Sequence, residues 1–161
     1  MDADLRTLRE RLADAAVAVA AAEAGADGLS LVNTLRGLAL DERTLKPRLA
    51  SATGGLSGPA LRPVALAAVH ACYRATPLPI VGMGGVETGR HALELVAAGA
   101  SAVALGTVLF ADTAAPARVR AELDAEAFRH GFDSPLAARG SAHADLVPSR
   151  PTGVVIVGNA R

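Results

Sequence analysis

Apolar residues along the chain gather into stretches that alternate between helical and extended character. From Leu5 to about Ala24 the sequence is rich in Ala, Leu and Arg, which favours a helix that Gly25 can end. Later apolar runs are short and continuous rather than alternating, which is typical of strands buried on both faces. They predict strands over residues 28–33, 78–83 and 101–110.

The segments between and after these runs have the composition and spacing of helices. Pro59 and Pro63 fit the first turn of a helix whose apolar residues recur as far as Ala75. Further helices are predicted over residues 87–100 and 115–132, with a glycine near the end of each. Because strands alternate with helices, the fold class is α/β, with a parallel sheet and right-handed crossovers.

A repeat is visible where helices lead into strands. The stretches AEAGADGLSLVNT and LVAAGASAVALGT share the frame A-G-A-x-x-L/V-x-L, with a threonine shortly after it. Each contains a helix end, a glycine turn, a strand and a polar residue at the carboxyl end of that strand. Repeated βα units of this kind favour a barrel over a doubly wound sheet.

Two segments show no clear period. Residues 36–58 form a long connection, and after Phe132 the composition shifts towards Pro, Ser and Gly. We therefore predict one domain over residues 1–132 and an irregular tail over residues 133–161. The stretch GVVIVG near the end predicts a lone strand without an obvious partner.

Composition narrows the classes of partner. The chain has 161 residues, which is short for an α/β barrel of about 250 residues. Zero net charge and few aromatic residues argue against nucleic acid and anionic membranes as partners. Asp14 and Glu23 interrupt the Ala-rich start, which favours a soluble helix over a signal peptide, and no apolar run approaches a membrane span. A single cysteine fits a reducing cytoplasm.

The stretch PIVGMGGVETG, residues 79–89, ends a predicted strand in glycines just before a helix. Glu87 stands where a dinucleotide fingerprint needs its last glycine, and no Gly-Lys-Ser/Thr follows as in a P-loop. These glycines have two interpretations. They could let an anion approach the free N–H groups at the start of the helix, or they could simply form a tight turn. Gly106 and Thr107 end the next strand beside this turn, which favours a phosphate site over two plain turns.

Other candidate residues are fewer. Asn33 and Thr34 end the first strand, where they either hydrogen-bond a planar polar ligand or form a turn. The loop TGGLSG precedes a helix and either touches a ligand or bends. Cys72 lies in mid-helix among apolar neighbours and reads as a core residue. We find no nucleophile–base pair, catalytic base or metal-ligand spacing.

From about Ala24 to Asp112 the chain resembles dihydroorotate dehydrogenase, most closely the NAD-linked class 1B catalytic subunit. The motifs VNTL, GGLSGPA, GMGG and GT occur in the family's order. The resemblance implies a TIM barrel that holds FMN and oxidises dihydroorotate to orotate in cytoplasmic pyrimidine biosynthesis. It also implies an electron-transfer subunit carrying FAD and an iron–sulfur cluster.

The resemblance assigns roles to individual residues. Asn33 and Thr34 match the pair that binds the pyrimidine, while Val32 and Gly58 match backbone contacts to FMN. The FMN phosphate cradle is matched by Gly84, Gly85, Gly106 and Thr107.

The resemblance also implies that much of the barrel is absent. The matching motifs belong to strands six to eight of the family, so the catalytic cysteine loop is missing, and Cys72 does not replace it. We expect an N-terminally truncated enzyme that is inactive alone. The alternatives are a non-catalytic half-barrel that binds FMN or phosphate, as an oligomer or with a separately encoded N-terminal half, and an interaction protein that uses its exposed sheet edges.

Overall fold

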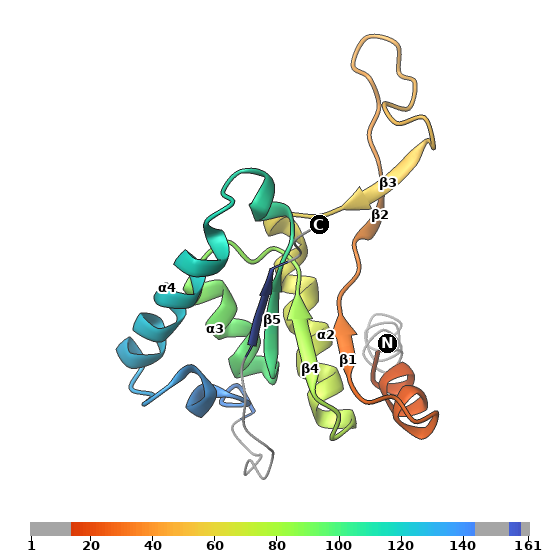
Figure 1. Ribbon diagram of the computed structural model, residues 1–161. Helices are drawn as coiled ribbons and strands as arrows, with labels where there is room; N and C mark the ends of the chain where they lie inside the picture. The colour runs from red at the N-terminus through yellow and green to blue at the C-terminus, as the bar shows by residue number, and fades with distance from the viewer. Residues whose placement is uncertain (1–13, 144–154, 159–161) are drawn as a thin grey trace, which may run out of the picture.

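Figure 1 shows the computed structural model of the protein, which describes residues 14–143 and 155–158. Helices and strands follow one another along the chain much as the hydrophobic pattern predicts. In chain order they are a helix over residues 14–23, β1 (Leu29–Leu31), β2 (Leu35–Leu38), β3 (Thr53–Leu56), the 3-10 turn η1 (Pro59–Leu61), α2 (Arg62–Ala75), β4 (Ile80–Met83), α3 (Gly89–Ala98), β5 (Ala102–Leu105), η2 (Thr107–Phe110), α4 (Ala115–Arg129), η3 (Pro135–Ala138) and β6 (Val155–Gly158). Residues 5–13 of the predicted first helix lie outside the described residues.

The strands β1, β4, β5 and β6 form one parallel sheet in that order. In the chain, α2 precedes β4, α3 connects β4 to β5, and α4 lies between β5 and β6. Each parallel neighbour is therefore reached through a helical crossover, as parallel pairing requires. The predicted α/β class with a parallel sheet is confirmed.

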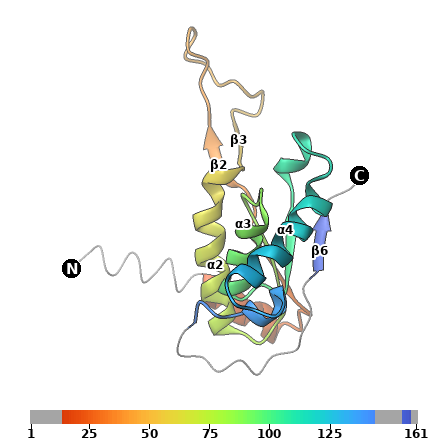
Figure 2. The ribbon, with the colours of Figure 1, turned by 90° about the vertical axis from the view of Figure 1, so that its left-hand side faces the viewer.

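The helices cover one face of this sheet. In β4, Ile80 and Gly82 are buried while Val81 and Met83 are half-buried, so the two faces of the strand have different surroundings. Figure 2 shows α2, α3 and α4 together on one side of the strands. The largest fully buried side chains lie in this layer, and each contributes about 1.5–3 kcal/mol by burial: Val69, Ile80, Leu95, Val96, Val103, Leu105 and Val119. Within the described part of the chain, no helix is long and apolar enough to cross a membrane.

Glycine turns lead from helix to strand as the sequence repeat predicts. Gly25 and Gly99, the glycines of the A-G-A frame in the two repeats, have φ of 87° and 123°. Only glycine adopts such angles without strain. At Gly99 a Cβ atom would also collide with the ring of Tyr73, so a close approach to α2 adds to the need for glycine.

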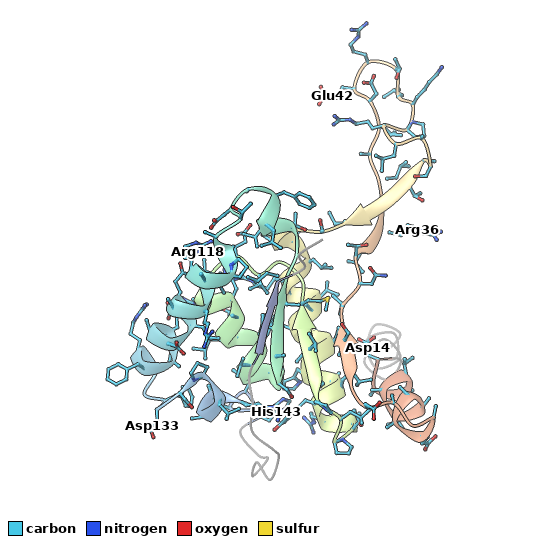
Figure 3. All side chains as sticks on the ribbon, in the orientation of Figure 1. Asp14, Arg36, Glu42, Arg118, Asp133 and His143 are labelled. Atoms are coloured by element: carbon cyan, nitrogen blue, oxygen red, sulfur yellow. The ribbon has the colours of Figure 1, made fainter. Side chains whose placement is uncertain are left out.

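The connection over residues 36–58 contains structure that the sequence pattern did not indicate. β2 and β3 pair antiparallel, with Leu35 opposite Leu56 and Leu38 opposite Thr53. They form a hairpin that projects from the carboxyl end of the sheet, and Arg36 and Glu42 lie on it (Figure 3). Three of the four residues of each strand are exposed, so neither strand shows the alternation by which a half-buried strand is found.

The predicted strand over residues 101–110 is too long. β5 ends at Leu105, and the apolar residues that follow form the 3-10 turn η2. Gly106 has φ −125° and ψ −95°, which turns the chain out of the extended conformation. The apolar run therefore continues through a change of backbone direction that hydrophobicity alone does not reveal.

The segment after α4, which was predicted to be an irregular tail, contains η3 and β6 among its described residues. After η3, the Gly140 and Ala142 N–H groups each donate a 3.1 Å hydrogen bond to the carbonyl groups of Val96 and Ala97 at the end of α3. β6 is not a lone strand, because it pairs with β5. Both corrections concern contacts with residues far away in the sequence, which local composition does not report.

Candidate functional site

The carboxyl ends of β1, β4 and β5 surround a cavity of about 560 Å³. Its floor is apolar and consists of Val81, Met83 and Ala104 on the sheet. The loops that follow the strands form its rim. In parallel α/β sheets this is the end at which ligands bind. The rim residues include Val32, Thr34, Ser57, Gly58, Gly84, Gly85, Val86, Glu87, Gly106, Thr107 and Val108.

The turn after β4 needs its glycines for two reasons. Gly84 and Gly85 have φ of 123° and 69°. A Cβ atom on Gly85 would lie 2.8 Å from the carbonyl oxygen of Gly58 and 3.0 Å from the backbone nitrogen of Arg62. The turn is therefore pressed against the loop that precedes α2, and the two loops form one wall of the cavity.

Gly106 differs from this pair. Its φ is negative, and a Cβ atom there would meet nothing within 4 Å. Neither backbone conformation in the left-handed region nor close packing accounts for glycine at this position. Gly106 lines the cavity and is the residue before η2, whose first N–H groups have no partner within the turn. The open space beside it leaves room for a ligand to approach these N–H groups.

The start of α3 is fixed by local hydrogen bonds. The Oγ1 of Thr88 accepts a 3.3 Å hydrogen bond from the His91 N–H, and the Glu87 N–H donates a 3.3 Å hydrogen bond to His91 Nδ1. Desolvation, followed by the positive charge of Arg62, lowers the pKa of His91 below its usual value. Above pH 6.5 His91 is therefore neutral, and its Nδ1 acts as an acceptor that holds the turn.

The cavity lining carries little charge. Among the lining residues, Glu87 alone has a charged side chain, so no lysine or arginine of the described chain lines the cavity. Arg118 on α4, labelled in Figure 3, donates hydrogen bonds of 3.2 Å to the carbonyl oxygen of Glu87. It also forms 2.8 Å ion pairs with Asp112 and Glu122. An anion in the cavity would therefore depend on backbone N–H groups rather than on a side-chain cation.

Asn33 and Thr34 follow β1, and the structure places them differently. Thr34 lines the cavity, but Asn33 is absent from its lining. The Oδ1 of Asn33 accepts a 2.7 Å hydrogen bond from the Thr34 N–H, which is a turn-type contact. The other residues singled out by sequence, namely Val32, Gly58, Gly84, Gly85, Gly106 and Thr107, all line the cavity.

Sequence reasoning did not single out Ser57 and Met83, which also line the cavity. Ser57 lies in the TGGLSG loop, so the loop was flagged although the residue was not. Met83 is the last residue of β4 and sits on the side of the strand away from the helices. The alternation of Val81 and Met83 with buried neighbours was the available signal.

Cys72 does not line this cavity, and the described residues form no cluster that could hold a metal ion. Cys72 is 1% exposed, and its Sγ donates a 3.5 Å hydrogen bond to the carbonyl oxygen of Asp14. Burial, with a smaller contribution from the charge of Asp14, raises the pKa of the Cys72 thiol to about 11. No group of three or more His, Cys, Asp or Glu side chains within residues 14–143 could hold a metal ion.

Comparison with known proteins shows which family the chain belongs to. The model of the dihydroorotate dehydrogenase family matches residues 11–126. The chain belongs to the dihydroorotate dehydrogenase family. The catalytic subunit of dihydroorotate dehydrogenase B (NAD(+)) from Bacillus thuringiensis (strain Al Hakam) is 47% identical over 134 residues, covering 83% of this chain and 43% of that protein. The subunit of the same name from Bacillus mycoides (strain KBAB4) is also 47% identical over 134 residues.

Solved structures of the family agree with the fold. Ligand-free dihydroorotate dehydrogenase from Eimeria tenella superposes with a TM-score of 0.67 and 32% identity, over 81% of this chain and 36% of that one. The complex of the Eimeria tenella enzyme with ferulenol gives a TM-score of 0.69 over 83% and 35% of the two chains. The chain therefore spans 43% of the length of the curated relatives and about a third of the solved chains.

The relatives also settle the type of family member. The identity of 47% to NAD(+)-linked catalytic subunits confirms the predicted class 1B resemblance. Proteins of this family are FMN-dependent flavoproteins. The cavity suits the phosphate end of such a cofactor, because it offers a glycine rim, the free start of η2 and open space beside Gly106.

Proposed function

We propose that the chain is the C-terminal part of the barrel of an NAD-linked dihydroorotate dehydrogenase catalytic subunit, and that its role in that barrel is to hold FMN. In this proposal β1, β4 and β5 are the sixth, seventh and eighth barrel strands. The observation that carries it is the cavity at their carboxyl ends, which is lined by the two glycine loops that follow β4 and β5.

In this proposal, different residues of the rim contact different parts of FMN and the pyrimidine. The loops at Gly84–Gly85 and Gly106–Thr107 would hold the phosphate through backbone N–H groups, with the Thr107 hydroxyl as an additional donor. Backbone atoms of Val32 and Gly58 would contact the rest of FMN, and Thr34 with Asn33 would hydrogen-bond the pyrimidine. Asn33 is not among the residues that line the cavity, so its side chain must turn towards the ligand to take part. FMN, when bound, supplies the acceptor for the hydride of dihydroorotate.

The reaction itself is proposed for the complete barrel. Proton removal requires a base beside the flavin; among the described lining residues Glu87 is the one with a titratable side chain, and no cysteine lines the cavity. The raised pKa of Cys72 and its buried position on α2, outside the cavity lining, exclude it from that role. We therefore expect the chain alone to bind FMN without converting dihydroorotate to orotate.

Partners and location complete the proposal. The relatives are catalytic subunits of an NAD(+)-linked enzyme, which supports an electron-transfer subunit with FAD and an iron–sulfur cluster as partner. Cys72 is a free thiol, in keeping with a cytoplasmic location.

A second candidate is a non-catalytic half-barrel that binds FMN or phosphate as an oligomer or beside a separately encoded N-terminal half. It is favoured by the half-buried apolar residues Val81, Met83 and Ala104 on the sheet face away from the helices. Orotate formation once an N-terminal half is added would favour the enzyme. Flavin binding with no turnover even in the presence of that half would favour the second candidate.

Titration of the chain with two flavins tests whether the glycine loops bind the phosphate group. FMN and riboflavin differ only in the phosphate, and their fluorescence reports binding. We expect FMN to bind at least about tenfold more tightly, because each charge-assisted hydrogen bond contributes roughly 1.5–3 kcal/mol. Gly106→Ala places a methyl group in the open space beside the phosphate site, so it should weaken FMN by about tenfold and leave riboflavin unchanged.

Gly131→Ala is the matched control. Gly131 has positive φ and open surroundings but lies after α4, away from the cavity lining. It should change neither affinity. Equal affinities of the unchanged chain for FMN and riboflavin, or no uptake of either, would contradict the proposed phosphate site.

A further inference from the structure

Strand β6 lies at the free edge of β5 although it is outside the part of the chain that matches the family. The family match ends at residue 126, whereas β6 covers Val155–Gly158. The pairing is parallel and runs the full length of β5, from Ala102 opposite Val155 to Leu105 opposite Gly158. In Figure 1 the two strands lie side by side and point in the same direction.

The position of β6 matters because of how barrels close. In a closed eight-stranded barrel every strand has two neighbours, and the last strand pairs with the first. One edge of β5 is occupied by β4 and the other by β6. If β5 is the eighth barrel strand, which rests on the proposed function, then β6 occupies the edge that the first strand needs.

We propose that β6 is an edge-capping strand that competes with the first barrel strand for β5. A sheet edge has one row of N–H and C=O groups, so only one of the two strands can pair with it at a time. The partner of this surface is therefore an extended segment that runs parallel to β5. Closure of the barrel requires β6 to leave.

The stretch from Arg139 to His143, which precedes β6 in the chain, is anchored close to the start of β5. The Nε2 of His143 donates a 2.9 Å hydrogen bond to the Ala98 carbonyl, and the Nε of the buried Arg139 donates one of 3.1 Å to the Gly99 carbonyl. The ring of His143 also stacks on His70 of α2 at a centroid distance of 3.9 Å. This anchor keeps β6 tethered beside its partner, and a tether raises the effective concentration of a strand for its edge.

The opposite edge of the sheet, formed by β1, has no such capping strand among the described residues. β1 pairs with β4, and within the described residues no second strand pairs with β1. An N-terminal half that docks on the sheet would therefore find the β1 edge open and the β5 edge covered. This asymmetry separates two steps of assembly, because docking at β1 leaves β6 in place whereas closure at β5 displaces it.

Complementation with a second polypeptide tests this competition. The partner is the segment that precedes the matched stretch in the Bacillus thuringiensis catalytic subunit, labelled with a dye for binding by fluorescence anisotropy. Ile156→Pro with Val157→Pro removes two backbone N–H groups of β6 and breaks the pairing. Ile156→Val with Val157→Ile keeps strand propensity and is the matched control. A chain that ends at His143 removes β6 without proline.

The expected result is tighter binding once β6 cannot pair. The proline variant and the chain ending at His143 should bind the N-terminal segment at least about tenfold more tightly than the unchanged chain. In the unchanged chain only the molecules whose β5 edge is free of β6 can bind, and the apparent affinity is reduced by that fraction. The control pair should bind like the unchanged chain. In hydrogen exchange, the amides of residues 155–158 should lose protection when the segment binds, while those of β5 stay protected.

Equal affinities for all chains, or amides of residues 155–158 that stay protected in the complex, would overturn the competition and leave the phosphate site intact. Binding to none of the chains would also overturn it, because β5 would then not accept a first strand. The comparison of FMN with riboflavin decides the proposed function separately, since it does not involve the β5 edge.

Discussion

The contact between the two glycine loops gives a prediction that can be worked out from the structure. In Gly85→Ala the new Cβ atom would lie 2.8 Å from the Gly58 carbonyl oxygen, 2.9 Å from Arg62 Cβ and 3.0 Å from the Arg62 backbone nitrogen. Two of these atoms belong to the backbone and the third is fixed to it, so none can rotate away. The φ of Gly85 is 69°, which alanine adopts at a cost of about 1–2 kcal/mol.

The crowding adds to that cost. Forcing an extra methyl group into a filled space typically costs about 1–3 kcal/mol. Together, the two effects predict that Gly85→Ala lowers the free energy of unfolding by about 2–5 kcal/mol. Equilibrium unfolding in urea, followed by circular dichroism, measures this difference, provided that the slope of the transition does not change.

A control variant separates the two contributions. Gly131 has a φ of 80° but nothing within 4 Å of a Cβ atom, so Gly131→Ala carries the backbone cost alone. The difference between the two variants is therefore the cost of the close approach. If Gly85→Ala were no more destabilising than Gly131→Ala, the turn after β4 would not press against the start of α2. The description of the cavity wall would then be wrong.

Three further predictions concern titratable groups. Because the pKa of His91 is lowered from 6.5, the neutral side chain stabilises the fold above pH 6.5, and this contribution is lost as the pH falls through the folded-state value; His91→Gln should flatten that part of a plot of unfolding free energy against pH. Cys72 should react with a thiol reagent at pH 8 only after unfolding in urea, because its thiol is buried and its pKa is raised to about 11. The hydrogen bond from Arg118 and then that from the Gly89 N–H lower the pKa of Glu122 from 4.5. Glu122→Gln should therefore destabilise the fold above pH 4.5 by no more than about 1 kcal/mol, and by less in high salt. A larger loss of unfolding free energy in urea titrations would contradict a surface ion pair.

The order of elements was predictable because the main features are local. Continuous apolar runs predicted the strands, and glycines at helix ends, such as Gly25 and Gly99, predicted the turns that the structure shows at positive φ. Gly131 likewise ends α4 with a φ of 80°. These residues act through their own backbone conformation, so neighbouring sequence was enough to interpret them.

The features that were missed depend on distant partners or on exposure. β6 was read as a lone strand because its pairing with β5 spans about fifty residues of sequence. The hairpin of β2 and β3 was missed because both strands are exposed and lack the alternation of a half-buried strand. Asn33 lies two residues after β1 rather than at the end of the strand, and its contact with the Thr34 N–H depends on side-chain rotamers that sequence does not fix.

In the proposed function, the residues that would hold the cofactor and those that would carry out the chemistry lie in different parts of the barrel, because of how barrels are built. The loops after β4 and β5 are neighbours in both sequence and space, so a single stretch from Gly82 to Thr107 contains both glycine loops that would hold the phosphate. Catalytic groups in barrels come from the ends of several different strands, so no short stretch contains them all. A partial barrel can therefore keep a phosphate site whose geometry is set by local turns. In the proposed function, proton removal requires the remaining strands to bring their loops to the same end of the sheet, and in the proposed competition the pairing of β6 with β5 opposes this.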